Sequence, residues 1–121
     1  MAPRIGIDLC EPARLRDRLS RTPELERELF HPGELAYCNA QRLPDQHLAA
    51  RFAAKEAVAK ALGIDGFDPL DVEIVEGGES CDVRLRHGAQ ERADALGVSV
   101  TVSLTHLPAM AAAVALALPV A

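Results

Sequence analysis

Aromatic side chains are scarce in this sequence of 121 residues, which contains no tryptophan, one tyrosine and three phenylalanines. Proteins that hold single-stranded nucleic acid stack its bases on aromatic rings, so the composition argues against such a surface. Acidic residues outnumber basic ones, eighteen to thirteen, and the net charge of -5 argues against general affinity for nucleic acid or anionic membranes. Because 49% of the residues are hydrophobic, the chain can still form a core, built from Ala, Val, Leu and Ile.

Cysteine is rare too, and Cys10, Cys38 and Cys81 form no CxxC pair. This spacing indicates neither a zinc site nor a disulfide framework, so we expect reduced thiols in a cytoplasmic protein. The most apolar stretch, residues 110–121, is shorter than the roughly 20 residues of a membrane-spanning helix. The length predicts a single domain that spans residues 1–121. A chain of this length is short for enclosing a large pocket within one protomer.

Apolar periodicity, prolines and glycines divide the chain into strands and helices in an irregular order. That order favours an α+β fold, with a mainly antiparallel sheet packed against helices. We expect Gly63 to end the longest helix. The Ala-rich last segment fits a strand, although its propensity also allows a helix. The expected strands are 4–10, 71–76, 81–86, 98–104 and 109–118, and the expected helices are 13–20, one that begins at Thr22-Pro23, 34–42, 45–62 and 90–96.

Asp8 stands near the end of the apolar segment IGIDL. A carboxylate in such a segment costs free energy unless it has a partner or a metal. A helix cap or a surface carboxylate at a strand end explains Asp8 equally well, and this residue alone does not decide.

The helical segment RFAAKEAVAKALG holds both lysines of the chain. Glu56 and Lys60 are four residues apart, as are Arg51 and Lys55, so each pair shares a helix face. Two ordinary charge pairs on a helix surface would have the same spacing. Alternatively, Glu56 and Asp8 together hold Mg²⁺, which takes one or two carboxylates alongside substrate phosphates, and the basic residues clamp a pyrophosphate.

Arg14, Arg18 and Arg21 follow one another at intervals of four and three, which predicts a basic stripe on the first helix. Such a stripe is either a solvated face or a docking surface for an acidic protein, and nothing in the stripe decides. His106 stands at the end of a predicted strand, in SLTH, where a structural histidine is the more common case.

Five segments of the chain resemble the holo-acyl-carrier-protein synthases, a family of phosphopantetheinyl transferases, and occur in the order seen there. Together they cover nearly the whole chain. The segment at 51–63 is highly specific, whereas GID and SLTH alone are weak. The segments are GIDLCE (6–11), FHPGELAYC (30–38), RFAAKEAVAKALG (51–63), DVEI (71–74) and SLTH (103–106).

The resemblance implies a transfer of the 4′-phosphopantetheine arm from coenzyme A to a serine of an apo acyl or peptidyl carrier protein, with release of adenosine 3′,5′-bisphosphate. Asp8 and Glu56 match the two Mg²⁺ ligands of the family. Lys60 matches a lysine near the coenzyme A phosphates, so the expected catalytic residues are Glu56 and Lys60. The serine proton leaves to Glu56 or to a metal-bound water, and the sequence does not choose between them.

The resemblance also implies binding surfaces. Arg51, Gly63 and His106, with Lys60, match positions that line the coenzyme A site. The acidic carrier protein is expected to dock on the first helix, at Arg14, Arg18 and Arg21. The family is typically a homotrimer with active sites between protomers, which would solve the problem of a chain too small to enclose its cofactor.

Three segments depart from the family pattern. The loop at 64–70 is short, lacks an extra Gly pair and carries two additional carboxylates, which would repel phosphates unless they point away. Residues 78–81 read GESC and lack a Gly-x-Pro, and Pro12 replaces an aliphatic residue. An alternative function is therefore a catalytically weakened binding module that holds a carrier protein or coenzyme A without transfer.

Overall fold

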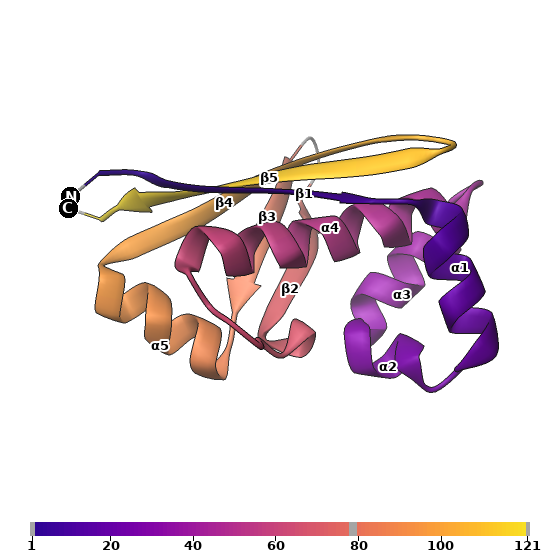
Figure 1. The fold of residues 1–121 in the computed structure, drawn as a ribbon, viewed down its shortest axis with the longest axis horizontal. Helices are drawn as coiled ribbons and strands as arrows, with labels where there is room; N and C mark the ends of the chain where they lie inside the picture. The colour runs from indigo at the N-terminus through magenta and orange to yellow at the C-terminus, as the bar shows by residue number, and fades with distance from the viewer. Residues whose placement is uncertain (1, 78–79, 121) are drawn as a thin grey trace.

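The computed structural model describes residues 2–77 and 80–120 (Figure 1). The chain begins with strand β1 (Arg4–Cys10) and continues through helices α1 (Pro12–Arg21), α2 (Leu25–Leu29), α3 (Pro32–Asn39) and the long α4 (Pro44–Leu62). A 3₁₀ turn, η1 (Pro69–Asp71), leads into strands β2 (Val72–Gly77) and β3 (Ser80–Leu85). Helix α5 (His87–Leu96) and strands β4 (Val98–Leu107) and β5 (Met110–Pro119) follow.

The strands pair in two antiparallel sheets, which confirms the predicted α+β class. One sheet has the order β1-β5-β4, and β2 and β3 form the other. In the larger sheet, Asp8 lies opposite Ala113, and His106 lies opposite Ala111. The Ala-rich last segment is the central strand of that sheet, because pairing on both sides outweighs the helical propensity of alanine.

Helix α4 crosses one face of the three-stranded sheet, with α5 at one end of the molecule and α1–α3 at the other (Figure 1). Small residues allow the helix to lie close to the strands. A Cβ atom added to Gly6 on β1 would lie 2.0 Å from the carbonyl oxygen of Ala57 on α4. Alanines 111, 113, 115 and 117 of β5 are all buried on the same side. The core therefore matches the aromatic-poor composition.

The other face of this sheet is apolar and exposed. Ile5, Ile7 and Leu9 of β1 are 69%, 60% and 60% exposed. Val114 and Leu116 of β5 lie in register with Ile7 and Ile5 and are only partly buried. Within the described part of the chain, no helix covers this face (Figure 1).

The two ends of the chain lie together. Arg4 pairs with Ala117, so the N- and C-termini leave from one corner, at the opposite end of the molecule from α1 (Figure 1). Among the described residues, no helix has the length and apolar character needed to cross a membrane.

The junction of α1 and α2 differs from the sequence prediction. Thr22 ends α1 rather than opening α2, because its N–H donates to the carbonyl oxygen of Arg18 at 3.0 Å. The N–H of Leu25 then donates to the carbonyl oxygen of Thr22 at 3.0 Å, so a turn separates the helices. Arg21 is the last residue of α1. Gly63 ends α4 in the left-handed conformation, with φ 67°, as predicted.

Candidate functional site

Asp8 and Lys60 meet between β1 and α4. Asp8 follows Gly6 by two residues on the strand face that α4 approaches. The Lys60 Nζ atom donates to Asp8 Oδ1 at 2.9 Å and to the carbonyl oxygen of Ile7 at 3.0 Å. An ammonium group has three hydrogens, and the Lys60 side chain is 57% exposed, so one hydrogen can still bind a ligand. The ion partner of Lys60 is thus Asp8 rather than Glu56, its helical neighbour.

Glu56 lies beside this pair, one turn before Lys60. Burial and the negative charge of Asp8 raise the pKa of Glu56, and Lys60 lowers it. The two carboxylates are therefore close enough to repel each other, and a cation between them would relieve this repulsion. Two carboxylates at a half-exposed position fit Mg²⁺, which takes its remaining oxygens from water and substrate phosphates. The described ranges contain no cluster of three or more His, Cys, Asp or Glu that could hold a metal by itself.

Lys55 is buried, so the interpretation of Arg51 and Lys55 as an ordinary charge pair on the helix surface is wrong. Its Nζ atom donates to Glu34 Oε1 at 2.8 Å and to the carbonyl oxygens of Pro69 at 3.0 Å and Val72 at 2.6 Å. Burial lowers the pKa of Lys55, and the negative charge of Glu34 opposes this effect. Glu34 also accepts hydrogen bonds from two backbone N–H groups. This buried pair joins α3, α4 and the start of β2, and it holds the end of the shortened loop.

Arg51 and His106 lie apart from Asp8 and Glu56. Arg51 precedes Glu56 by five residues, which places the two side chains about 140° apart around α4. The Arg51 guanidinium is buried and stacks 4.3 Å from the centre of the Tyr37 ring. His106 is on β4, two strand spacings or about 10 Å from β1. Within one chain, the expected coenzyme A residues therefore form two separate groups.

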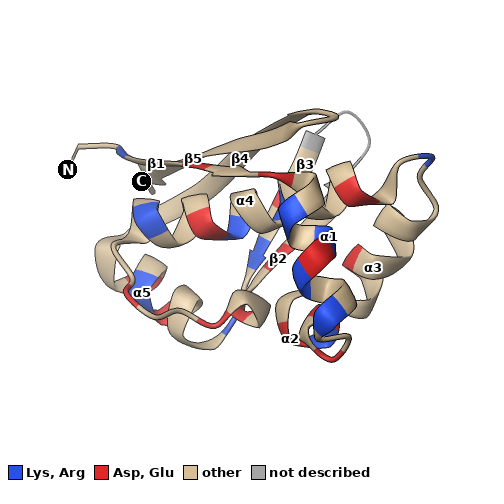
Figure 2. Cartoon of the chain, turned by 45° about the vertical axis from the view of Figure 1, so that its right-hand side comes forward, with Lys and Arg blue, Asp and Glu red and all other residues tan. Residues whose placement is uncertain are grey.

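Arg14 and Arg18 border a groove between α1, β1 and the start of β5. The groove has a volume of about 480 Å³. Figure 2 shows several basic positions on α1, at the end of the molecule that also holds α2 and α3. Arg14 and Arg18 outnumber the one acidic lining residue, Glu11, so the groove combines an apolar floor with a net basic edge. Such a surface suits an acidic, amphipathic partner. The apolar lining residues are Leu9, Leu15, Phe52 and Met110.

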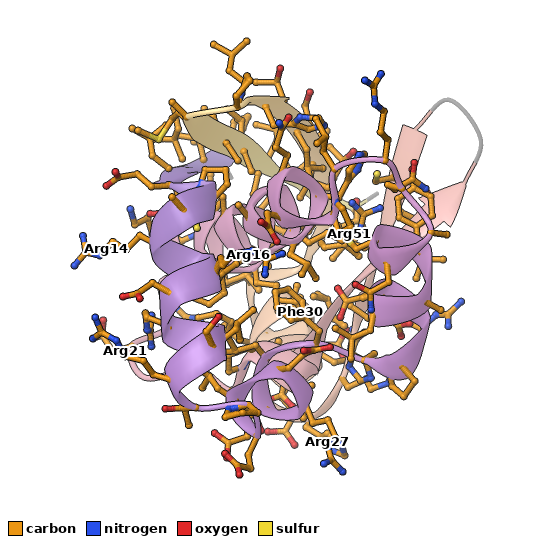
Figure 3. All side chains as sticks on the ribbon, turned by 90° about the vertical axis from the view of Figure 1, so that its right-hand side faces the viewer. Arg14, Arg16, Arg21, Arg27, Phe30 and Arg51 are labelled. Atoms are coloured by element: carbon orange, nitrogen blue, oxygen red, sulfur yellow. The ribbon has the colours of Figure 1, made fainter. Side chains whose placement is uncertain are left out.

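The other arginines of α1 have partners within the chain. Arg21 pairs with Asp17 at 2.8 Å, although both side chains are largely exposed. Arg16 donates two hydrogen bonds to Asp45, the second residue of α4. One runs from Nε to Oδ2, and the other runs from Nη2 to Oδ1 at 2.6 Å. Figure 3 shows Arg14 and Arg21 reaching outward from α1, whereas Arg16 lies on the side that faces the other helices. The predicted stripe is therefore present, but only Arg14 and Arg18 line the groove.

Two of the residues that depart from the family pattern, Asp68 and Pro12, have roles within the chain. Asp68 Oδ1 accepts the N–H of Leu70 at 2.9 Å, so one additional carboxylate turns toward its own loop. Asp65 is exposed. Gly63, expected to line the coenzyme A site, has the Arg4 side chain close by. Pro12 is the first residue of α1, where its missing N–H costs nothing. Gly78 and Glu79 of the GESC segment lie outside the described residues.

Two residues near these groups were missed by sequence reasoning. Glu34 is 21 positions before Lys55, and no spacing rule connects them. Gln46 Oε1 lies 2.8 Å from His106 Nδ1, and no motif marks this glutamine. Their partners come from remote segments, so only the folded chain reveals them.

The chain is similar to known proteins over most of its length. The profile of the 4′-phosphopantetheinyl transferase superfamily matches residues 4–114. The chain is 47% identical over 116 residues to a holo-[acyl-carrier-protein] synthase of Moorella thermoacetica, covering 92% of this chain and 90% of the relative. It is 46% identical over 116 residues to one of Streptomyces avermitilis, with 93% and 94% covered.

Solved structures give the same result. The acyl carrier protein synthase of Mycobacterium tuberculosis superposes with a TM-score of 0.74 at 30% identity, covering 96% of both chains. The holo-[acyl-carrier-protein] synthase of Helicobacter pylori, determined in complex with coenzyme A, superposes with a TM-score of 0.80 at 26% identity, covering 93% of this chain and 98% of the other. The chain therefore belongs to the 4′-phosphopantetheinyl transferase superfamily.

Proposed function

We propose that the chain is a holo-acyl-carrier-protein synthase, which moves the 4′-phosphopantetheine arm of coenzyme A to a serine of an apo acyl or peptidyl carrier protein. The observation that carries this proposal is the cluster of Asp8, Glu56 and Lys60, which joins two carboxylates and a half-exposed ammonium at the contact of β1 and α4. The family membership and the names of the relatives support it.

The residues of the cluster would have distinct roles. Asp8 and Glu56 would hold Mg²⁺, which supplies positive charge to the pyrophosphate of coenzyme A. Lys60 keeps Asp8 in place through one hydrogen and would donate another to a phosphate oxygen. These contacts orient the phosphate and stabilise the charge that shifts onto the leaving group.

The transfer exchanges one P–O bond for another. The serine oxygen of the carrier attacks the phosphorus that bears the pantetheine arm, and the bond to the nucleotide breaks, releasing adenosine 3′,5′-bisphosphate. Asp8 already binds Lys60, whereas Glu56 has no hydrogen-bond or ion-pair partner among the described residues. Glu56 therefore has an oxygen that can accept the serine proton.

The carrier protein would dock at the groove on α1. Arg14 and Arg18 are placed to pair with acidic residues of a carrier helix, and the apolar floor would take one of its apolar side chains. Arg21 would add a weaker contact, because Asp17 already neutralises part of its charge. We also propose a cytoplasmic location, where the thiols of Cys10, Cys38 and Cys81 would remain reduced.

The chain would act as a homotrimer with sites between protomers. The exposed Ile5, Ile7 and Leu9 supply an apolar face of the kind that subunit contacts bury. In this arrangement one protomer would supply Asp8 to a shared site and its neighbour would supply His106.

Mixed oligomers test this arrangement. Asp8→Asn and His106→Ala protomers, each of low activity alone, are unfolded, mixed in equal amounts and refolded together. Shared sites in a random trimer would give about a quarter of the wild-type activity, because one site in four combines the two intact residues. Sites within single chains would give no recovery, since every site would carry one lesion. Analytical ultracentrifugation of the wild-type protein measures the oligomeric state directly.

Intact-mass spectrometry tests the activity itself. A panel of apo-carrier proteins is incubated with the protein, coenzyme A and Mg²⁺. A gain of one phosphopantetheine group on a carrier, abolished by a chelator, is the expected result. If no carrier gains mass although coenzyme A binds in calorimetry, either the panel lacks the right carrier or the chain is the binding module that its altered loops also permit.

A further inference from the structure

His106 is held from two sides by the first turn of α4. Its Nδ1 atom lies 2.8 Å from the side-chain oxygen of Gln46, which is only 9% exposed. The ring of His47, the next residue, meets the His106 ring edge-on with 4.7 Å between centres. The rings of His47 and Tyr37 are in turn 6.0 Å apart in a similar arrangement.

The contact with Gln46 determines which ring nitrogen of His106 carries hydrogen. An amide oxygen only accepts hydrogen bonds, so Nδ1 is the donor. The other nitrogen, Nε2, is then left to meet a ligand. The edge contact with His47 limits rotation of the ring, so both its tautomer and its direction are determined by neighbouring residues of α4.

We propose that Gln46 is a positioning residue for coenzyme A: it holds His106 so that Nε2 faces the substrate. This inference rests on the proposed function, in which His106 lines the coenzyme A site. Without Gln46 the imidazole could exchange its tautomers and rotate. Coenzyme A would then have to order the ring when it binds, and the free energy that this costs would weaken its binding.

The experiment compares Gln46→Leu, Gln46→Glu and the wild-type protein. The leucine variant removes the acceptor at nearly the same volume, and the glutamate variant keeps an acceptor for Nδ1. Gln90→Leu on α5 is the matched control, because Gln90 is exposed and its side chain donates to Asp94 of its own helix. All four proteins are labelled with ¹⁵N-histidine and assayed with coenzyme A, Mg²⁺ and a carrier protein.

Two readouts are expected to change in Gln46→Leu. The ¹⁵N spectrum of His106 changes from the Nδ1–H form to a mixture of tautomers. The KM for coenzyme A rises about fivefold, the factor that corresponds to one neutral hydrogen bond, while kcat stays within about twofold. Gln46→Glu keeps the wild-type KM, because a carboxylate oxygen can also accept the hydrogen of Nδ1. Gln90→Leu behaves as wild type.

An unchanged His106 spectrum in Gln46→Leu overturns the proposal. A changed spectrum with unchanged KM also overturns it, because Gln46 would then order a histidine that coenzyme A does not contact. If the wild-type protein transfers nothing, calorimetric binding of coenzyme A replaces KM. Failure of the proposed function is thereby distinguished from failure of this inference.

Discussion

Lys55 and Lys60 are five residues apart on the same helix, yet their surroundings differ in almost every respect. Lys55 and its partner Glu34 are both fully buried, whereas the side chains of Lys60 and Asp8 are 57% and 22% exposed. Lys55 donates three hydrogen bonds to groups within the chain, and Lys60 donates two. One helix thus carries an ion pair that organises the fold and another that is accessible to a substrate.

The difference shows how burial changes the meaning of the same pair of charges. Removing one partner of a fully hydrogen-bonded, buried ion pair is strongly destabilising, because the remaining charge is left without a partner and without water to solvate it. A half-exposed pair contributes little to stability, since water can replace either partner. Lys55 should therefore matter for unfolding and Lys60 for catalysis.

The largest expected effect is on stability. Lys55→Met leaves Glu34 buried without its counter-charge and should lower the free energy of unfolding by about 3–5 kcal/mol. Urea denaturation at one fixed protein concentration measures this loss. Lys60→Met is the matched control and should cost less than about 1 kcal/mol. Equal losses for the two variants would contradict the distinction between the lysines.

The next effect is on transfer. Asp8→Asn keeps the shape of the side chain but removes the charge that holds Lys60 and, in our proposal, Mg²⁺. We expect kcat to fall about 100- to 1000-fold, as when one preorganised electrostatic contact is lost, with little change in the urea midpoint. The same substitution at the exposed Asp94 of α5 is the control and should leave kcat unchanged. Full activity in Asp8→Asn would refute the assignment of the cluster.

Gly6→Ala should affect both properties at once. Its new Cβ atom would lie 2.0 Å from the Ala57 carbonyl oxygen, so β1 and α4 must move apart. We expect a loss of about 1–3 kcal/mol in the free energy of unfolding, together with lower activity because Asp8 moves away from Lys60. A Cβ atom added to Gly88 would meet Asp71 Oδ2 at 3.7 Å, an ordinary contact, so Gly88→Ala tests glycine replacement without a clash.

The smallest effect concerns carrier binding. Arg14→Glu or Arg18→Glu should raise the KM for an acidic carrier about tenfold, because like charges then face each other across the groove. Arg21→Glu should have a weaker effect, since Arg21 lies outside the groove lining and pairs with Asp17. Steady-state assays at several salt concentrations measure these changes, which should shrink as salt screens the charges. An equal effect at Arg21 would extend the docking surface to the end of α1.

Much of the fold could be predicted from the sequence. The strand at Arg4–Cys10 and the helix ended by Gly63 follow from local apolar patterns and from one glycine cap. The sequence does not show that Lys55 is buried and Lys60 is exposed. Alanines occur on all sides of α4, so the apolar pattern does not indicate which face of the helix is buried. Thr22-Pro23 has the residue types of a helix start. In the structure, however, the N–H of Thr22 donates to the carbonyl oxygen of Arg18 and so ends α1.

The site was less predictable than the fold. The residue types allowed Asp8 and Glu56 to share a cation as one of two alternatives, and only the family resemblance favoured it. The two residues lie on separate elements, and no spacing rule links them. The residues that hold others in place were not predicted at all. Glu34 and Gln46 act on Lys55 and His106 from distant segments, and such contacts depend on tertiary packing that local patterns do not encode.

The neighbouring ends of the chain have a practical consequence for engineering. Since Arg4 and Ala117 are paired, an affinity tag or a surface anchor at either terminus would leave from the corner opposite α1. Immobilised protein should therefore still present its groove to a partner in solution. A short peptide could also connect the two ends and allow circular permutation, with new termini opened at an exposed position such as Gly66.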